Sequence, residues 1–360
     1  MSEQRLLILV GSYSEAADNG IHTYSLDAQN GKLQKLGELA GLKNPTFLNV
    51  DASNSRLYSI AEGVSEQGER TAEAVAIAYN ANTGELQETS RALGLTASAC
   101  HVLRDTDNRF LLLSSYGGGR VGLVGLKDDG EIGEIRDIKQ HEGRSVNVER
   151  QQEPHPHSAA FSPDGRYVFV PDLGIDRIRT YSIDVGQGTL KFHHDNELHP
   201  GAGPRHMVFH PGGQFAYVIN ELDSTITAFS YNAEEGRLST IETVSTLPAD
   251  YTGESDCAEI AVSEDGKFLY GSNRGHDSIA VYGIDAATGK LALVQHVSVE
   301  GAHPRHFALM PGGQLLLVAN RDTNNITVFR VERDTGRLQF TGHSETVSKP
   351  VCIVSAQLDN

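Results

Sequence analysis

Short apolar runs recur along this chain in a fixed order. Each copy has an apolar run, a turn rich in Pro, Asp and Gly, a second apolar run ending in a polar pair, a third apolar run, and then Gly-x-Leu or Gly-x-Ile. The clearest copy spans residues 157–190. β-Branched and aromatic residues dominate the runs, as at 268–272 and 279–285, and turn residues bound them, which is typical of strands. No segment shows a sustained helical period, so the pattern predicts an all-β chain with three or four strands per copy.

The spacing of the copies indicates a propeller. The Gly-x-Leu or Gly-x-Ile signals lie about 50 residues apart, the period of propeller blades, and end at Leu33, Leu86, Ile132, Leu190, Leu238, Leu291 and Leu338. Full copies begin near Phe47, Cys100, His157, Arg205, Ala258 and Arg305. The N-terminal remnant lacks a first strand, and residues 350–355 supply only that strand. We therefore predict one domain over residues 1–360, a seven-bladed β-propeller whose last blade is closed by N- and C-terminal strands.

Two polar segments break the repeat. Residues 63–72 lengthen the first full copy, and residues 141–153 lengthen the link before His157. Both segments are predicted to be loops.

Composition and charge narrow the class of partner. The chain has 37 Gly and only 3 Met, which suits many short strands joined by tight turns better than long helices. Its formal net charge is -17, and no run of Lys and Arg exceeds two residues. A nucleic-acid partner is therefore not expected, because phosphate backbones require a basic face. Local arginines must hold any anionic ligand against an unfavourable overall field.

Cysteine usage and hydropathy suggest where the protein works. Cys100, Cys257 and Cys352 form no CxxC and are odd in number, which is typical of a reducing compartment. The apolar run at residues 6–10 is short for a signal sequence, and no run approaches the ~20 apolar residues of a membrane span. We expect a cytoplasmic protein with no membrane partner. No exposed apolar stripe is evident, so we expect a monomer or a weak homodimer.

Alignment of the copies produces two columns of residues on the first strands. The first column reads Phe47, Cys100, His157, Arg205, Ala258, Arg305 and Val351, and the second reads Leu48, His101, Ser158, His206, Glu259, His306 and Cys352. Small or apolar residues are expected here if the strands only pack, yet five of the seven entries in the second column are polar. First strands line the channel of a propeller, so these side chains are predicted to converge on an axial pocket.

Another column follows the second strands. Its first position holds Asn220, Asn273 and Asn320, and its next position holds Glu221, Arg274 and Arg321. Asn commonly ends a strand by bonding its own backbone, which favours a structural role for the first position. Glu221 and Arg274 are longer than a turn needs and occupy equivalent sites in adjacent blades, which favours a functional role for both.

Other chemistries have weaker support. His155 and His157, separated by one residue, could chelate a metal ion, but the predicted pocket also holds arginines that disfavour a divalent cation. No Gly-x-Ser-x-Gly elbow is present for nucleophilic catalysis. Cys352 fits a small buried filler better than a reactive thiol. We expect neither a cofactor nor a metal.

Several motifs resemble one known family. Residues 154–158, 201–206, 220–224, 258–260, 272–278 and 304–306 are similar to the seven-bladed propeller lactonases, which include the cycloisomerase-type 6-phosphogluconolactonases. The family also contains a fungal carboxy-cis,cis-muconate cyclase. The catalytic residues proposed for that enzyme match His157, Arg205, Glu221 and Arg274 of this chain.

The resemblance implies hydrolysis of 6-phospho-D-glucono-1,5-lactone to 6-phosphogluconate, a step of the pentose phosphate pathway. Water would be activated by a general base, either His157 or Glu221, without a metal. Substrate-binding roles are expected for His101, His206, Glu259, Asn273, His276, Arg305, His306 and Arg321. One of Arg274, Arg305 and Arg321 would hold the phosphate.

Four alternatives remain open at this stage. They are a muconate-type lactone cyclase, another sugar lactonase, a metal-dependent lactonase of another propeller type, and a non-catalytic scaffold. The chain has no Trp and hence no Trp-Asp repeats, and its predicted channel is charged, which argues against the scaffold.

Overall fold

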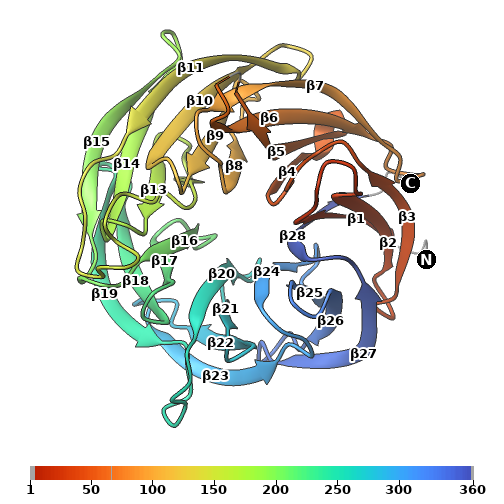
Figure 1. Cartoon of the computed structure of the whole chain (residues 1–360). Coiled ribbons are helices and arrows are strands. Elements are labelled where there is room, and N and C mark those ends of the chain that lie inside the picture. Colours follow the sequence, from red (N-terminus) through yellow and green to blue (C-terminus); the bar gives the residue numbers. More distant parts are fainter. Residues whose placement is uncertain (1–4, 66, 358–360) are drawn as a thin grey trace.

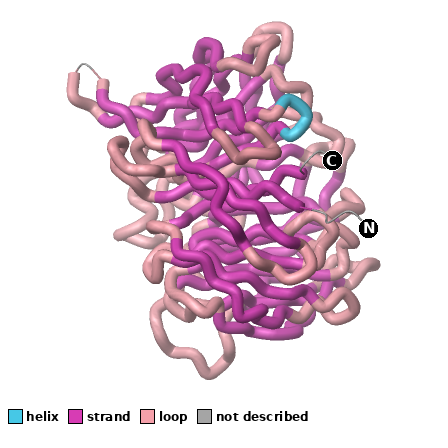
Figure 2. The backbone as a smooth tube through the Cα atoms, turned by 90° about the vertical axis from the view of Figure 1, so that its right-hand side faces the viewer, coloured by secondary structure: helices cyan, strands magenta, loops and turns pink. Residues whose placement is uncertain are grey.

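The computed structural model describes residues 5–65 and 67–357 of the chain. Its strands form seven four-stranded sheets arranged as blades around a central channel (Figure 1). The predicted all-β, seven-bladed propeller is confirmed. Within the described residues the only helical segment is the 3-10 turn η1 (Ala52–Asn54), which is cyan in Figure 2. No helix in that part of the chain has the length and hydropathy of a membrane span.

The first three full blades each use four consecutive antiparallel strands. Blade one contains β4 (Leu48–Asp51), β5 (Arg56–Val64), β6 (Arg70–Tyr79) and β7 (Leu86–Leu95). Blade two contains β8 (His101–Arg104), β9 (Phe110–Ser115), β10 (Arg120–Leu126) and β11 (Ile132–Gln140). Blade three contains β12 (Ala160–Phe161), β13 (Val168–Asp172), β14 (Arg177–Asp184) and β15 (Thr189–Glu197).

The next three blades follow the same order. Blade four contains β16 (Pro204–Phe209), β17 (Phe215–Asn220), β18 (Thr225–Asn232) and β19 (Arg237–Ser245). Blade five contains β20 (Asp256–Val262), β21 (Phe268–Arg274), β22 (Ser278–Ile284) and β23 (Leu291–Ser298). Blade six contains β24 (Pro304–Leu309), β25 (Leu315–Asn320), β26 (Asn325–Val331) and β27 (Leu338–Thr346).

The seventh blade joins both ends of the described chain, as predicted. It contains β1 (Arg5–Ser12), β2 (Ile21–Asp27), β3 (Leu33–Leu39) and β28 (Pro350–Gln357), in the spatial order β28-β1-β2-β3. β28 pairs antiparallel with β1, so the C-terminal strand takes the innermost place (Figure 1). The ring is therefore closed by backbone hydrogen bonds and leaves no open seam between its two ends.

A repeated contact between neighbouring blades explains the Gly-x-Leu signals. The buried hydroxyl groups of Tyr58, Tyr217 and Tyr270 each donate a hydrogen bond of 3.0 Å to a glycine carbonyl of the next blade. The acceptors include Gly289 and Gly336, whose φ angles of 71° and 69° favour glycine. At each site the phenol fills the space between the blades, and its hydroxyl group fixes the neighbouring turn.

The two segments that break the repeat have different secondary structure. Residues 63–72 are not the loop that the sequence predicted, because the β5–β6 ladder continues to the pair Val64 and Arg70. The extra residues lengthen a hairpin whose backbone groups are satisfied by pairing, so polar side chains are tolerated. Residues 141–153 contain no strand, as predicted, and this loop carries a side chain to the channel mouth.

Candidate active site

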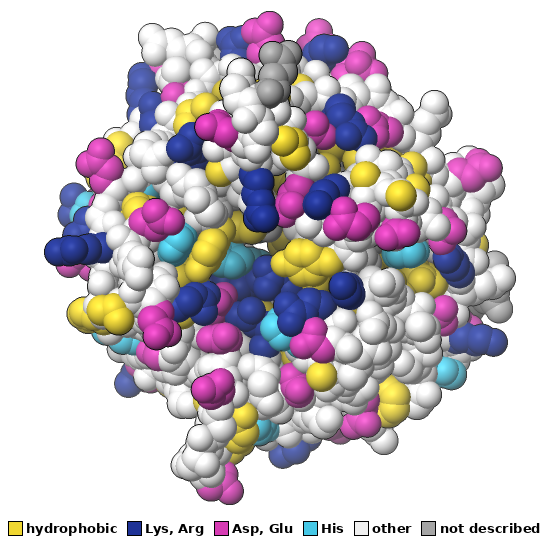
Figure 3. Space-filling model, in the orientation of Figure 1, with side chains coloured by type: hydrophobic (Ala, Val, Ile, Leu, Met, Phe, Trp, Pro, Cys, Tyr) yellow, Lys and Arg dark blue, Asp and Glu magenta, His cyan; other side chains and the backbone are white. Residues whose placement is uncertain are grey.

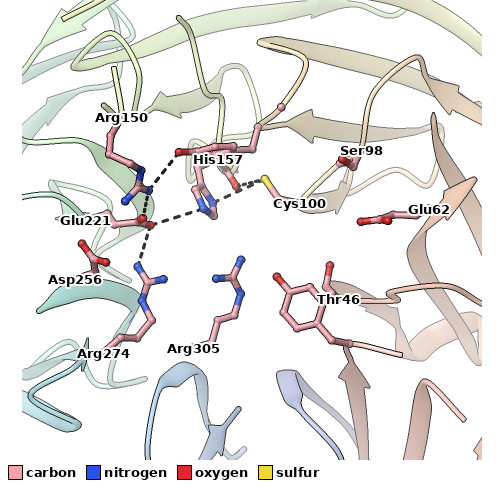
Figure 4. A pocket seen from close by; sticks show the side chains of 14 residues that line it. Thr46, Glu62, Ser98, Cys100, Arg150, His157, Glu221, Asp256, Arg274 and Arg305 are labelled. Carbon is pink, nitrogen blue, oxygen red and sulfur yellow. Dashed lines mark hydrogen bonds and ion pairs between the residues drawn. The ribbon is translucent and has the colours of Figure 1, made fainter. Parts of the chain in front are cut away.

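A cavity of about 380 Å³ lies at one mouth of the central channel. That volume is in the range of sites for small ligands. Figure 3 shows this face of the molecule, with arginine or lysine and histidine side chains gathered around a central hollow. The cavity is lined from several blades, and Figure 4 shows its side chains from close by. The lining includes Cys100, Tyr116, Arg150, His157, Glu221, Asp256, Arg274 and Arg305.

Glu221 is the electrostatic centre of the cavity wall. β17 ends at Asn220, whose amide donates to Thr225 and Thr227, and the next residue directs its carboxylate toward the channel. Three guanidinium groups meet this carboxylate, as Figure 4 shows for two of them: Arg150 Nη2 at 2.6 Å, and Arg205 Nε and Arg274 Nη2 at 3.0 Å each.

These ion pairs decide the protonation state of Glu221. Burial by itself raises the pKa of this carboxyl group, because the charged form loses hydration. Arg274, Arg205 and Arg150 outweigh burial and lower the pKa to about 2. Glu221 is therefore an ionised carboxylate at neutral pH.

His157 lies beside this ion cluster and is 4% exposed. It follows Pro156 in an extended link before β12, where its N–H donates to the carbonyl of Pro171 at 3.0 Å. Its Nε2 atom is 3.9 Å from Glu221 Oε2 (Figure 4). Burial, and then the charge of Arg205, hold the pKa of His157 well below its usual value. The imidazole is therefore neutral at pH 7 and can accept a proton.

Arg205 lies behind the cavity surface. Its Nη1 atom donates to the carbonyl of Ala258 at 2.7 Å and to His206 Nε2 at 3.1 Å, while its Nε faces Glu221. Burial is the main cause that lowers the pKa of Arg205 to about 10, and Arg305 adds to the effect. Arg205 nevertheless stays a cation at neutral pH.

Four predicted substrate-binding residues form a second layer inside the channel. They are His101, His206, Glu259 and His306, each 5–8% exposed, and none lines the cavity. The strand register explains this position. Pro204 pairs with Asn220 and His206 pairs with Ile219, so His206 lies further from the strand end that carries Glu221.

Arg305 differs from the other arginines of the site. It lines the cavity from β24, and its guanidinium carbon lies 5.7 Å from the centre of the Tyr13 ring. Within residues 5–65 and 67–357, no carboxylate lies within 4.0 Å of this guanidinium group. Its charge is available to a ligand.

Three other predicted substrate-binding residues lie outside the cavity lining. Asn273 is fully buried and bonds the side chain and backbone of Thr246, as the structural interpretation of its column anticipates. His276 bonds Ser278 Oγ at 2.6 Å within its own turn. Arg321 pairs with Asp322 at 2.6 Å and lines a neighbouring hollow. In each case contacts within the protein use polar atoms that a ligand would need.

Several residues that line the cavity were not among the candidates of the sequence analysis, and they include Tyr116, Arg150 and Asp256. Tyr116 lies in the column that contains Glu221, which was its available signal. Arg150 comes from the 141–153 loop. Gln151 anchors that loop through bonds of 2.8 Å to Leu173 O and 2.7 Å to Asp176 Oδ1. A loop that breaks the repeat has no aligned column, so its arginine gave no signal.

Asp256 lines the cavity and, like Glu62, has no arginine partner in the described part of the chain. Burial, and then the charge of Glu221, raise its pKa above the usual value. Among the described residues, no group of three or more His, Cys, Asp or Glu is arranged to hold a metal ion.

Comparisons with known proteins bear on this fold and this site. Residues 7–355 match the family described as "Lactonase, 7-bladed beta-propeller". A relative from Bacillus subtilis (strain 168), named 6-phosphogluconolactonase, is 38% identical over 302 residues, which cover 84% of either chain.

Two solved structures have a similar fold over nearly the whole of this chain. The periplasmic gluconolactonase PpgL of Pseudomonas aeruginosa has a TM-score of 0.91 and 30% identity, covering 99% of this chain and 100% of that one. A protein from Lactobacillus plantarum has a TM-score of 0.89 and 31% identity, covering 98% and 99%. The predicted family is confirmed, and the chain belongs to the seven-bladed β-propeller lactonases.

Proposed function

We propose that this protein hydrolyses 6-phospho-D-glucono-1,5-lactone to 6-phosphogluconate in the cavity at the propeller mouth. The observation that carries the proposal is the arrangement of its arginines. Arg150, Arg205 and Arg274 share the carboxylate of Glu221, and Arg305 has no carboxylate partner among the described residues. This positively charged lining of the cavity suits an anionic ligand. The Bacillus subtilis relative is named for the same activity.

His157 is the better candidate for the general base. Its low pKa keeps the ring neutral at pH 7, so a ring nitrogen can accept a proton from water. Glu221, whose pKa is lowered to about 2 and whose carboxylate faces three guanidinium groups, is a weak base at that pH. At 3.9 Å from His157 Nε2, the Glu221 carboxylate can instead stabilise the imidazolium that forms.

The proposed reaction needs no group beyond these side chains. The water oxygen bonds to the lactone carbonyl carbon while His157 takes its proton, and negative charge collects on the carbonyl oxygen. Arg274, which lines the cavity, stabilises that charge, and Arg205 supports it from behind through their shared partner Glu221. The bond to the ring oxygen then breaks, and His157 returns the proton to it. General-base help of about 10²–10⁴-fold is sufficient for a δ-lactone, which is already reactive.

Arg305 is the best candidate for the phosphate contact. Arg274 is committed to Glu221 and to the carbonyl of Cys257, and Arg321 is committed to Asp322. A guanidinium group with free N–H donors matches phosphate oxygens in a bidentate contact. The nearby cations also disfavour a divalent metal ion in the same cavity.

The test compares hydrolysis of 6-phosphogluconolactone and plain gluconolactone by the purified protein, with and without EDTA. We expect Arg305→Ala to raise KM for the phosphorylated lactone about tenfold more than for the plain one, since one charge-assisted contact is lost. Arg321→Ala is the matched control and should change both values less than about twofold.

Each alternative has its own outcome in this test. Absence of hydrolysis of both lactones contradicts the proposal and favours a scaffold. Equal use of both lactones indicates a plain sugar lactonase, and loss of activity in EDTA indicates a metal. Loss of the ultraviolet absorbance of a carboxymuconate diene would reveal the cyclase.

A further inference from the structure

The second layer of the channel is a chain of buried polar groups in close contact. The carboxylate of Glu259 lies 3.1 Å from His206 Nδ1 and 3.1 Å from His306 Nε2, and it accepts the N–H of Ile260 at 3.0 Å. At one end of the chain His206 Nε2 contacts Arg205 Nη1. At the other end the backbone N–H of Ile353 points to His306 Nδ1 at 3.3 Å.

The groups at the two ends define the proton positions. Arg205 can only donate, so His206 Nε2 must accept and its proton lies on Nδ1. A backbone N–H also only donates, so His306 Nδ1 accepts and its proton lies on Nε2. Both imidazole N–H groups therefore point at Glu259. Burial keeps the pKa of each histidine below its usual value, which agrees with neutral rings.

Glu259 accepts hydrogen bonds from the N–H groups of His206 and Ile260, and it lies 3.1 Å from His306 Nε2. Burial raises its pKa, and His306, the N–H of Ile260 and Arg205 oppose that rise. We favour the ionised form, because every contact that this carboxyl group makes in the described chain is with a donor.

We propose that Glu259, His206 and His306 are positioning residues that hold Arg205 against Glu221, so that the Glu221 carboxylate stays where it can stabilise the protonated His157. This inference rests on the proposed function. Neither these three side chains nor Arg205 lines the cavity, so they act through Glu221, which does, and not through substrate. The chain fixes Nη1 of Arg205 between His206 and the carbonyl of Ala258, which leaves the Nε edge for Glu221.

The electrostatics of the channel show why such support is needed. Arg205 is 3% exposed and is repelled by Arg305 and Arg274. Glu221 and Glu259 are the anions that oppose this repulsion. Without the charge of Glu259, Arg205 is expected to turn toward solvent, because a buried cation is destabilised unless nearby anions neutralise it.

Glu259→Gln is the decisive variant. A glutamine amide cannot accept hydrogen bonds at both of its terminal atoms, so one histidine must change its tautomer. If His206 presents Nε2–H to Arg205, two donors face each other and Arg205 is displaced. We expect kcat for the lactone to fall by about tenfold or more, with KM within about threefold, because Glu221, which Arg205 holds, faces the imidazolium charge that develops on His157 in the transition state.

A double-mutant cycle separates positioning from general damage. In the Arg205→Lys background, Glu259→Gln should reduce kcat less than about twofold further, because the orientation that it supports is already lost. Thr23→Val removes the buried hydrogen bond from β2 of blade seven to the carbonyl of Gly84, a contact that involves none of these side chains, and is the control for stability alone. Multiplicative losses in the double mutant, or an unchanged kcat in Glu259→Gln, would overturn the proposal.

A spectroscopic readout does not depend on activity or on that variant folding. Two-bond ¹H–¹⁵N correlation of histidine rings in the wild-type protein should show a neutral Nδ1–H tautomer for His206 and a neutral Nε2–H tautomer for His306. Any other pair of tautomers, or a protonated ring, refutes the network. Inactivity of the wild-type protein toward lactones would instead refute the proposed function and leave this spectrum interpretable.

Discussion

Glu221→Gln tests the electrostatic account of the site most directly. The substitution keeps the size of the side chain and removes its charge. Glu221 Oε1 then no longer balances Arg150 at 2.6 Å, and Oε2 no longer balances Arg205 and Arg274 at 3.0 Å. The guanidinium groups would remain buried or half-buried without their shared counter-ion.

The pKa of Glu221 gives the size of the effect. Its fall from 4.5 to about 2 corresponds to roughly 3 kcal/mol of favourable interaction with the ionised form. The group is 4% exposed, so solvent does not screen most of this energy. We expect Glu221→Gln to lower the free energy of unfolding at pH 7 by about 3 kcal/mol, a large share of the ~5–15 kcal/mol typical of a folded protein.

The sign of the pH dependence follows from the depressed pKa. The stabilisation by Glu221 is complete above the unfolded-state pKa near 4.5 and is lost as pH falls toward about 2. Urea unfolding of both proteins at pH 7, 5, 4 and 3 should therefore show a stability difference that is nearly constant down to about pH 5 and then shrinks.

The control for this measurement is a surface carboxylate. Glu38 pairs with Lys35 on β3 and is largely exposed, so Glu38→Gln should change stability by less than about 1 kcal/mol at every pH. A stability of Glu221→Gln within about 0.5 kcal/mol of wild type at pH 7 would refute the argument. A difference that grows on acidification would refute it equally.

Three further variants probe other parts of the site. His157→Gln should lower kcat/KM by about 10²–10⁴-fold with unchanged circular dichroism, and near-normal lactone hydrolysis would exclude its role as base. Asp256→Asn removes an anion from the cavity wall, so steady-state KM for the phosphorylated lactone should fall severalfold; a rise would show that Asp256 binds substrate. Gly174→Ala would place a Cβ atom 1.9 Å from the carbonyl oxygen of Glu153, and thermal unfolding should show that the free energy of unfolding falls by about 1–3 kcal/mol. Gly186→Ala, whose Cβ atom would have its nearest neighbour at 3.6 Å, should leave stability unchanged.

Much of the fold was predictable because the sequence repeat reflects a contact that recurs between neighbouring blades. A tyrosine hydroxyl group and a glycine turn meet at blade boundaries, as for Tyr217 and Gly289, so the glycine recurs at a regular spacing. The polar columns were also informative, since neighbouring first strands place equivalent residues around one axis. His157, Glu221 and Arg274 could therefore be placed near each other from alignment of the copies alone.

The rest of the site depends on information that a repeat does not carry. Arg150 belongs to a segment without counterparts in other blades, so no alignment could place it at the cavity. Asn273 and His276 occupy positions near Arg274, but their polar atoms are used within turns. Depth along the channel was not predictable either, because one step along β24 separates Arg305, which lines the cavity, from His306 in the second layer.

The late arrival of β28 has a consequence for synthesis on the ribosome. Among the described strands β1 is synthesised first, and the edge that pairs with β28 stays unpaired until nearly the whole described chain has been translated. The same late strand brings the N–H of Ile353 to His306. A nascent or truncated chain that lacks β28 thus has an unpaired edge on β1 and a His306 without its contact to Ile353. Enzymatic activity should therefore appear only after β28 has paired with β1.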